Sequence, residues 1–249
     1  ESLENKMIAH KEKMEKDNLE ANMEKSDYFS KRVQRVLMCP PGFFEIEFEI
    51  NPYMKKGTKV NLQKAWDEWY NLYTLIKSFD VEVDILKPIK WLPDLVFPAD
   101  AGFILPSTLA KEPTIVLANF KYPERQREEY YYEEYFRSKN YKVIRLPRNI
   151  SFEMNIRQTD NFYLMAYGQR NDKEGVELMK KLLTDKPVYA LELISPWFYH
   201  LSCALAIINN ETVMYYPLAF DEESNKILEK LFMYIIILND EEAKNLTGN

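Results

Sequence analysis

Few side chains in this 249-residue sequence are of the types that act as nucleophiles or proton carriers. The only histidines are His10 and His200, and the only cysteines are Cys39 and Cys203. An imidazole titrates near neutral pH and can carry a proton, whereas a thiolate can attack an electrophilic carbon. Two cysteines do not make a disulfide framework, and their spacing from the histidines does not match a zinc site. We therefore expect no metal site, and we expect Cys203 to be a core cysteine of a strand.

The composition is typical of one folded α/β domain. Hydrophobic residues make up 46% of the chain, which is enough to bury a sizeable core. The net charge of -6 argues against a nucleic-acid-binding protein, which needs a basic face to neutralise phosphates. The longest apolar run, residues 231–238, is far too short to cross a bilayer. The sequence therefore predicts a soluble protein without a transmembrane segment.

Strand-like runs and helical stretches alternate from residue 33 onward. Predicted strands cover residues 33–39, 81–86, 94–105, 114–120, 142–146, 162–167, 188–193, 203–208, 212–216 and 234–238. Predicted helices cover residues 60–79, 124–138, 173–183 and 222–232. We interpret this order as four ββαβ-like units, although an ordinary doubly wound sheet shows the same alternation.

Residues 1–32 differ from the rest of the chain. They contain neither Pro nor Gly and are rich in Glu, Lys, Asn and Met. We predict a helical extension with a thin apolar stripe, followed by a domain over residues 33–249. Such a stripe is too weak to hold a helix alone. The extension is therefore either a frayed leader or a helix that docks on a partner.

Seven short segments resemble motifs of the guanidino-group-modifying superfamily, which comprises amidinotransferases, dimethylarginine dimethylaminohydrolases and arginine deiminases. They are Val36-Leu-Met-Cys-Pro-Pro-Gly-Phe-Phe-Glu45, Ile50-Asn-Pro-Tyr-Met54, Leu92-Pro-Asp-Leu-Val-Phe-Pro-Ala-Asp-Ala-Gly102, Tyr122-Pro-Glu-Arg-Gln-Arg-Glu128, Ala166-Tyr-Gly-Gln-Arg170, Phe198-Tyr-His-Leu201 and Tyr215-Tyr-Pro-Leu-Ala-Phe220. Each match is weak alone, but together and in this order they are specific. The resemblance implies the pentein fold, an α/β propeller of five ββαβ modules, of which four are seen here.

The resemblance also implies a chemistry, in which a cysteine thiolate attacks the guanidinium carbon while a histidine acts as general acid and base. Acidic residues hold the guanidinium nitrogens, and no cofactor or metal is needed. His200 matches the catalytic histidine, Glu153 matches an acid of the site, and Asp100 keeps an acid near it. Arg170 resembles an arginine that holds a substrate carboxylate in parts of the family. An exposed or ion-paired arginine remains the alternative there.

A structural ion pair at the start of a helix is expected for Arg125 and Glu128.

Two substitutions depart from the family pattern. Arg157 and Ser202 each stand where the family has an aspartate. A hydroxyl at position 202 cannot stabilise an imidazolium as a carboxylate would. An arginine at position 157 would repel a guanidinium, and we predict that it fills the vacated pocket and pairs with Glu153 or Asp100. Neither Cys39 nor Cys203 matches the nucleophile, which the family carries in a fifth module that would begin near Asn249.

These departures lead us to expect a catalytically inactive relative that serves as a structural or interaction subunit of a larger assembly, in mitochondria or the cytoplasm. The helix over residues 1–32 and an open edge after Asn249 would be its contact surfaces, with no nucleic-acid partner. The alternative is an active guanidino hydrolase or amidinotransferase acting on arginine or a methylarginine, with a cysteine nucleophile beyond residue 249. A third hypothesis is a module that senses a guanidino compound without turnover.

Overall fold

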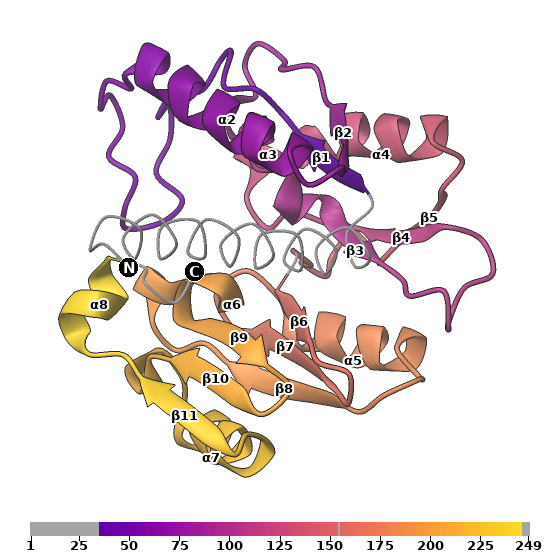
Figure 1. Ribbon diagram of the computed structural model, residues 1–249, viewed down its shortest axis with the longest axis vertical. Helices are drawn as coiled ribbons and strands as arrows, with labels where there is room; N and C mark the ends of the chain where they lie inside the picture. The colour runs from indigo at the N-terminus through magenta and orange to yellow at the C-terminus, as the bar shows by residue number, and fades with distance from the viewer. Residues whose placement is uncertain (1–34, 154, 246–249) are drawn as a thin grey trace, which may run out of the picture. The chain divides into compact units, whose positions relative to one another are not determined.

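The computed structural model describes residues 35–153 and 155–245 (Figure 1). The chain divides into two compact units, and each is considered by itself. Of the described residues, the first unit contains 35–42 and 61–88, and the second contains 43–60 and 89–245. The helix predicted over residues 1–32 and the edge expected after Asn249 lie outside the described residues, so both stay predictions.

The first unit consists of two parallel strands connected by one helix. Its elements are β1 (Arg35–Met38), α2 (Leu62–Lys77) and β2 (Glu82–Ile85). Asn61 caps the helix by accepting a hydrogen bond from the backbone N–H of Lys64, which is the usual role of an asparagine at this position. Arg35 lies opposite Glu82 in the strand register, and their side chains pair at 2.7 Å. The predicted strand, helix and strand are confirmed to within two residues at each end.

Three modules of identical order form most of the second unit. In each, two antiparallel strands are followed by a helix and then by a third strand parallel to the second (Figure 1). The modules are β3 (Gly102–Ile104), β4 (Thr114–Leu117), α3 (Pro123–Gln126), α4 (Glu128–Ser138) and β5 (Lys142–Arg145); β6 (Ile156–Gln158), β7 (Tyr163–Tyr167), α5 (Lys173–Leu182) and β8 (Val188–Glu192); and β9 (Leu205–Asn209), β10 (Thr212–Tyr215), α7 (Glu222–Leu231) and β11 (Tyr234–Ile237). The ββαβ interpretation is confirmed for this unit.

Short helical turns replace strand at two places where the prediction was wrong. The strand predicted over residues 94–105 is instead two 3₁₀ turns and a three-residue strand, because Pro93 and Pro98 each begin a turn and cannot donate to a sheet. The strand predicted over residues 203–208 begins only at Leu205, and Cys203 lies on a helical turn. The short elements are η1 (Pro93–Val96), η2 (Pro98–Ala101), η3 (Pro196–Phe198), α6 (Leu201–Ala204), η4 (Pro217–Ala219) and α8 (Asp240–Lys244).

The modules of the second unit are joined by isolated β-bridges outside the named strands and by shared hydrophobic clusters. An isolated bridge between Asn119 and Phe152 links the first module to the second, and one between Leu193 and Phe220 links the second to the third. The middle strands β4 and β7 are almost wholly buried, as expected for strands covered on both faces. No helix among residues 35–153 and 155–245 has both the length and the apolar character required to span a bilayer.

Candidate active site

The candidate site residues occupy equivalent places in the three modules of the second unit. Asp100, Glu153 and His200 each lie in the segment that leads into the first strand of a module, β3, β6 and β9 respectively. The first and second strands of a module are antiparallel, so the segment before the first strand lies beside the C-terminal end of the second strand. Arg125 follows β4 and Arg170 follows β7 at that end. The repeat of the module therefore gathers acids, arginines and the histidine from distant parts of the sequence.

His200 lies between two carboxylates. Its Nε2 donates to Oε2 of Glu153 at 2.8 Å, and its Nδ1 lies 3.7 Å from Oδ1 of Asp100. The ring is buried and contacts the ring of Tyr199 at a centroid separation of 4.8 Å. A carboxylate therefore lies beside each ring nitrogen of His200. The predicted association of Asp100, Glu153 and His200 is present in the structure.

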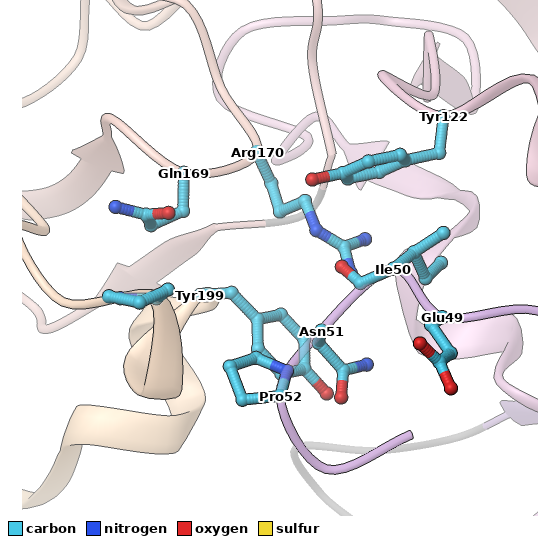
Figure 2. A pocket seen from close by; sticks show the side chains of 9 residues that line it. Glu49, Ile50, Asn51, Pro52, Tyr122, Gln169, Arg170 and Tyr199 are labelled. Atoms are coloured by element: carbon cyan, nitrogen blue, oxygen red, sulfur yellow. The ribbon is translucent and has the colours of Figure 1, made fainter. Parts of the chain in front are cut away.

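Glu153 is fully buried, and its carboxylate also pairs with Arg170. Nη1 of Arg170 donates to Glu153 Oε2 at 3.1 Å, and Nη2 donates to the backbone carbonyl of Ile50 at 3.0 Å. The guanidinium lies between the rings of Tyr122 and Tyr199, with its central carbon 4.8 and 4.7 Å from their centroids (Figure 2). Arg170 is therefore a buried, ion-paired and stacked arginine. Of the alternative given above, an exposed or ion-paired arginine, the ion pair is observed and the exposure is not.

The environment of Glu153 favours its ionised form. Burial by itself would raise its pKa, but the hydrogen bond from His200 and the charges of His200, Arg170 and Arg125 together hold the pKa below its usual value. The backbone N–H of Glu153 is in turn held by Oδ1 of Asn171 at 2.6 Å. Glu153 is thus a fixed negative charge at the side of the imidazole.

A second buried arginine, Arg125, holds Asp100. Its Nη1 donates to Asp100 Oδ2 at 2.7 Å, while Nε and Nη2 donate to the two carboxylate oxygens of Glu128 at 3.0 and 2.8 Å. Asp94 also lies near, with its carboxylate 3.9 Å from Nε and its backbone carbonyl 3.3 Å from Nη2. The expected ion pair between Arg125 and Glu128 is present, but it is joined to the site through Asp100 and is not a separate feature of the helix start.

Burial shifts the titration of this second cluster. It raises the pKa of Glu128 to about 7, although Arg125 opposes the shift, and it also raises the pKa of Asp94 against the same arginine. For Arg125, burial lowers the pKa, but Asp100 and Glu128 outweigh it and the net pKa is raised. Arg125 is therefore charged throughout the accessible pH range, and the carboxylates around it compete for one cation.

A pocket of about 280 Å³ adjoins these residues within the second unit. Figure 2 shows the side chains around it, which are Glu49, Ile50, Asn51, Pro52, Tyr122, Gln169, Arg170, Pro196 and Tyr199. Arg170 and Tyr199 belong both to the pocket wall and to the ionic cluster, since Arg170 pairs with Glu153 and Tyr199 contacts His200. The pocket wall carries one carboxylate (Glu49), one guanidinium (Arg170) and the rings of Tyr122 and Tyr199, so it offers partners for both a cationic and an anionic group.

The structure shows which groups surround the two positions, 157 and 202, that depart from the family pattern. Glu153 and Asp100, from distant parts of the sequence, supply the negative charge that Ser202 lacks beside His200. The observed ion-pair partners of Glu153 are Arg170 and His200. Nη1 of Arg157 donates to the carbonyl of Ile156 at 3.2 Å. Burial lowers the pKa of Arg157, whereas Cys203 and Asp100 raise it, so this guanidinium lies within electrostatic reach of the site.

Both cysteines are buried and neither forms a disulfide. Burial raises the pKa of Cys203 above its ordinary value, although hydrogen bonds from the His200 backbone and the Ser202 side chain lower it. A raised pKa reduces the thiolate fraction, so Cys203 is poorly suited to nucleophilic attack. Among the described residues, no group of three or more His, Cys, Asp and Glu side chains is arranged to hold a metal ion.

Sequence comparison identifies the family. A model described as "N,N dimethylarginine dimethylhydrolase, eukaryotic" matches residues 43–249. The chain is 32% identical over 212 residues to the N(G),N(G)-dimethylarginine dimethylaminohydrolase of Mycobacterium tuberculosis, covering 85% of this chain and 68% of that protein. It is 35% identical over 200 residues to the bifunctional arginine dihydrolase/ornithine cyclodeaminase AgrE of Nostoc sp., covering 78% of this chain. The match spans only about a quarter, 27%, of AgrE.

Structural comparison gives the same result. The N-terminal domain of ArgZ, a cyanobacterial arginine dihydrolase solved with substrate as a cysteine-to-serine variant, is 33% identical with a TM-score of 0.78, over 86% of this chain and 79% of that one. The dimethylarginine dimethylaminohydrolase of Pseudomonas aeruginosa, at 18% identity and a TM-score of 0.64 over 85% of this chain and 78% of that one, shares the fold. The predicted pentein-like α/β fold is confirmed.

The expectation of a catalytically inactive structural subunit is wrong. Relatives at about one-third identity are named as arginine dihydrolases and as a dimethylaminohydrolase, and ArgZ has been solved with substrate, with product and with a covalently bound reaction intermediate. The expectation rested on the lack of a cysteine at the nucleophile position and on Ser202 and Arg157, which were judged as isolated positions. The motif matches had placed Asp100 and Glu153 in the site, and the structure shows that these two carboxylates, from two other modules, lie on either side of His200.

Proposed function

The chain belongs to the eukaryotic N,N-dimethylarginine dimethylhydrolase family, and from this membership we propose that it is a hydrolase acting on the guanidino group of arginine or a methylarginine. The observation that carries the proposal is the position of His200 between Asp100 and Glu153. A histidine between two carboxylates is a proton donor poised beside a site that favours a cation. The named activities of the relatives support the same reaction class.

The reaction proceeds in two balanced halves. A cysteine thiolate bonds to the guanidinium carbon, and the C–N bond to the departing amine breaks as His200 gives that amine its proton. This leaves a covalent thiouronium intermediate and a neutral imidazole. Water then attacks the same carbon and gives one of its protons to His200. As the C–S bond breaks and the thiolate leaves, the remaining hydroxyl proton is lost to solvent, where the departed amine takes it up, and a neutral ureido product is released. His200 thus returns to its starting state.

The carboxylates take separate roles in this proposal. Glu153 is fully buried and engaged by Arg170 and His200, so it orients the imidazole and stabilises its charge. The Asp100 side chain is 15% exposed and has one oxygen, Oδ1, turned toward His200 and the other held by Arg125. Asp100 is therefore the acid that we propose contacts the substrate guanidinium. Arg170, in the pocket wall, is proposed to face the amino-acid end of the substrate.

The nucleophile is proposed to lie beyond residue 249. Cys203 is buried with a raised pKa, which disfavours its thiolate, and neither Cys203 nor Cys39 matches the family's nucleophile position. The full natural chain, incubated with arginine or with N,N-dimethylarginine, should release ammonia or dimethylamine respectively together with a ureido product. His200→Gln should reduce the rate at least about 100-fold, the usual contribution of a general acid. Equal rates for the two proteins would refute the role of His200.

The compartment, mitochondrial or cytoplasmic, stays a prediction that cell fractionation with an antibody to the native protein would decide.

A further inference from the structure

The wall of the pocket in the second unit carries one positive and one negative side chain. Of the nine residues that line it, only Arg170 and Glu49 are charged, and Figure 2 shows both. The acid that pairs with Arg170 is the buried Glu153 and not Glu49. The chemistry proposed above gives Arg170 a role at the amino-acid end of the substrate and leaves Glu49 without one.

Arg170 is held in place by four contacts, so it fixes where an anion can bind. Nη1 donates to Glu153 at 3.1 Å, and Nη2 donates to the backbone carbonyl of Ile50 at 3.0 Å. The guanidinium lies between the rings of Tyr122 and Tyr199. A guanidinium has five N–H donors in one plane, and the two hydrogen bonds use only part of them. An anionic group in the pocket can therefore be bound along the edge of this plane.

Glu49 is tied to the same arginine through the backbone. It directly precedes Ile50, which is buried and whose carbonyl accepts from Arg170. The carboxylate of Glu49 is itself anchored, because Oε1 accepts from the backbone N–H of Lys56 at 2.8 Å. The side chain is nevertheless exposed, and its second oxygen is available to a ligand. The negative and the positive group of the pocket wall are thus held close together along the chain.

This pairing suits the amino-acid end of a small molecule. An α-amino acid carries its ammonium and its carboxylate on one carbon, so the two groups need partners of opposite charge in the same wall. Arg170 is the partner for the carboxylate, and a carboxylate such as Glu49 is the partner for an ammonium with its three donors. A ligand without the ammonium would leave Glu49 desolvated and unpaired, which lowers its affinity.

We propose that Glu49 is a specificity-determining residue that binds the α-ammonium group of the substrate. The site then takes free arginine or a free methylarginine in preference to guanidino compounds that lack this group. The proposal rests on the proposed function for the identity of the substrate. A Glu49 that served only to accept from Lys56 would not distinguish ligands with an ammonium from ligands without one.

The test compares arginine with 5-guanidinopentanoate, which is arginine with hydrogen in place of the α-ammonium. Calorimetric titration of the full natural chain carrying His200→Gln measures binding while turnover is slowed. Arginine should bind about 10-fold or more tightly than 5-guanidinopentanoate, the value of one hydrogen bond between charged groups. Adding Glu49→Gln, which keeps an oxygen for Lys56, should reduce this preference to about 3-fold or less.

Glu47→Gln is the matched control. Glu47 is an exposed acid two residues earlier in the same segment, but it is not part of the pocket wall. In the same His200→Gln background it should leave the preference for arginine unchanged. Glu49→Ala is a second variant, and it should remove the preference as Glu49→Gln does.

An undiminished preference in a folded Glu49→Gln or Glu49→Ala protein would overturn the proposal. Equal binding of the two compounds, or no binding of either, by the protein with Glu49 intact would overturn it as well. The result is distinct from failure of the proposed function, because binding is measured apart from turnover. A preference for arginine that depends on Glu49, in a chain whose natural form makes no product, would refute the hydrolase and leave the ammonium site standing.

Discussion

Replacing Glu153 with glutamine should expose the energetic importance of the buried ion pair beneath the site. Glu153 is 0% exposed and Arg170 is 2% exposed, and the substitution leaves the arginine charge buried without its counter-ion. Removing one partner of a buried pair typically costs 3–5 kcal/mol. Because a glutamine oxygen can still accept from Arg170, we expect the lower end of that range, about 3 kcal/mol. For a chain of this size, that corresponds to a fall of about 6–12 °C in the unfolding midpoint.

Urea unfolding at pH 7, followed by the fluorescence of the four tryptophans, measures the free energy of unfolding directly. Glu177→Gln is the control, because that acid is exposed and pairs only with Lys180, and its midpoint should match the wild type. The double variant Glu153→Gln with Arg170→Met removes both charges and should lose less than the sum of the two single changes. A loss below about 1 kcal/mol for Glu153→Gln would refute the buried pair.

The pH dependence of the same comparison has a definite sign. The pKa of Glu153 is lowered from 4.5 in the folded state, chiefly because His200 and Arg170 outweigh the effect of burial. Its contribution to stability is therefore present above pH 4.5 and is lost as the pH falls through the folded-state value. The advantage of the wild type over Glu153→Gln should shrink in acid, and an advantage that grew in acid would contradict the assignment.

Three further perturbations test the surrounding structure. Gly102→Ala should destabilise the protein by about 2 kcal/mol or more, because the backbone φ is +149° and a Cβ would lie 2.3 Å from the carbonyl oxygen of Val116; thermal unfolding measures it. Asp221→Ala should cost about 1 kcal/mol in urea, since its side chain caps α7 through the N–H of Ser224. Burial raises the pKa of Glu128 from 4.5 to about 7, so its contribution is full below pH 4.5 and decreases as the pH rises through 7. Between pH 4.5 and pH 7 and above, this group changes the free energy of unfolding by at most about 3 kcal/mol. In the Glu128→Gln variant that pH-dependent change should be absent.

Local sequence patterns were sufficient for most of the regular elements. The helix predicted over residues 173–183 is observed as Lys173–Leu182, and the strand predicted over 188–193 as Val188–Glu192. In both segments apolar residues recur at the spacing of the element, and neither segment contains a proline that would favour a turn. The prediction over residues 94–105 was wrong because an apolar run outweighed Pro93 and Pro98, whose missing N–H groups turn the chain into 3₁₀ turns. The three-residue strand Ile156–Gln158 was too short for a period to be visible.

Some residues of the site could be found from local motifs, whereas their contacts with one another depend on the fold. Motif matches identified Asp100, Glu153 and His200, and the structure brings these three together. The role of Asp94, and the connection of Arg125 to Asp100, were missed because they depend on pairing across a fold and not on spacing. The same limit explains why Ser202 was taken as a loss of function. Ser202 carries no negative charge, but Asp100 and Glu153, from the other two modules, place carboxylates beside His200.

The most direct test of the proposed function is the formation of a ureido product by the full natural protein. It should be incubated with arginine and separately with N,N-dimethylarginine, and the ureido product and released amine should be quantified together over many turnovers. The account predicts equal amounts of ureido compound and amine (or ammonia, from arginine) from one of the two substrates, and formation of both at least about 100-fold more slowly with His200→Gln. A full-length, folded natural protein that forms neither product from either substrate would contradict the account.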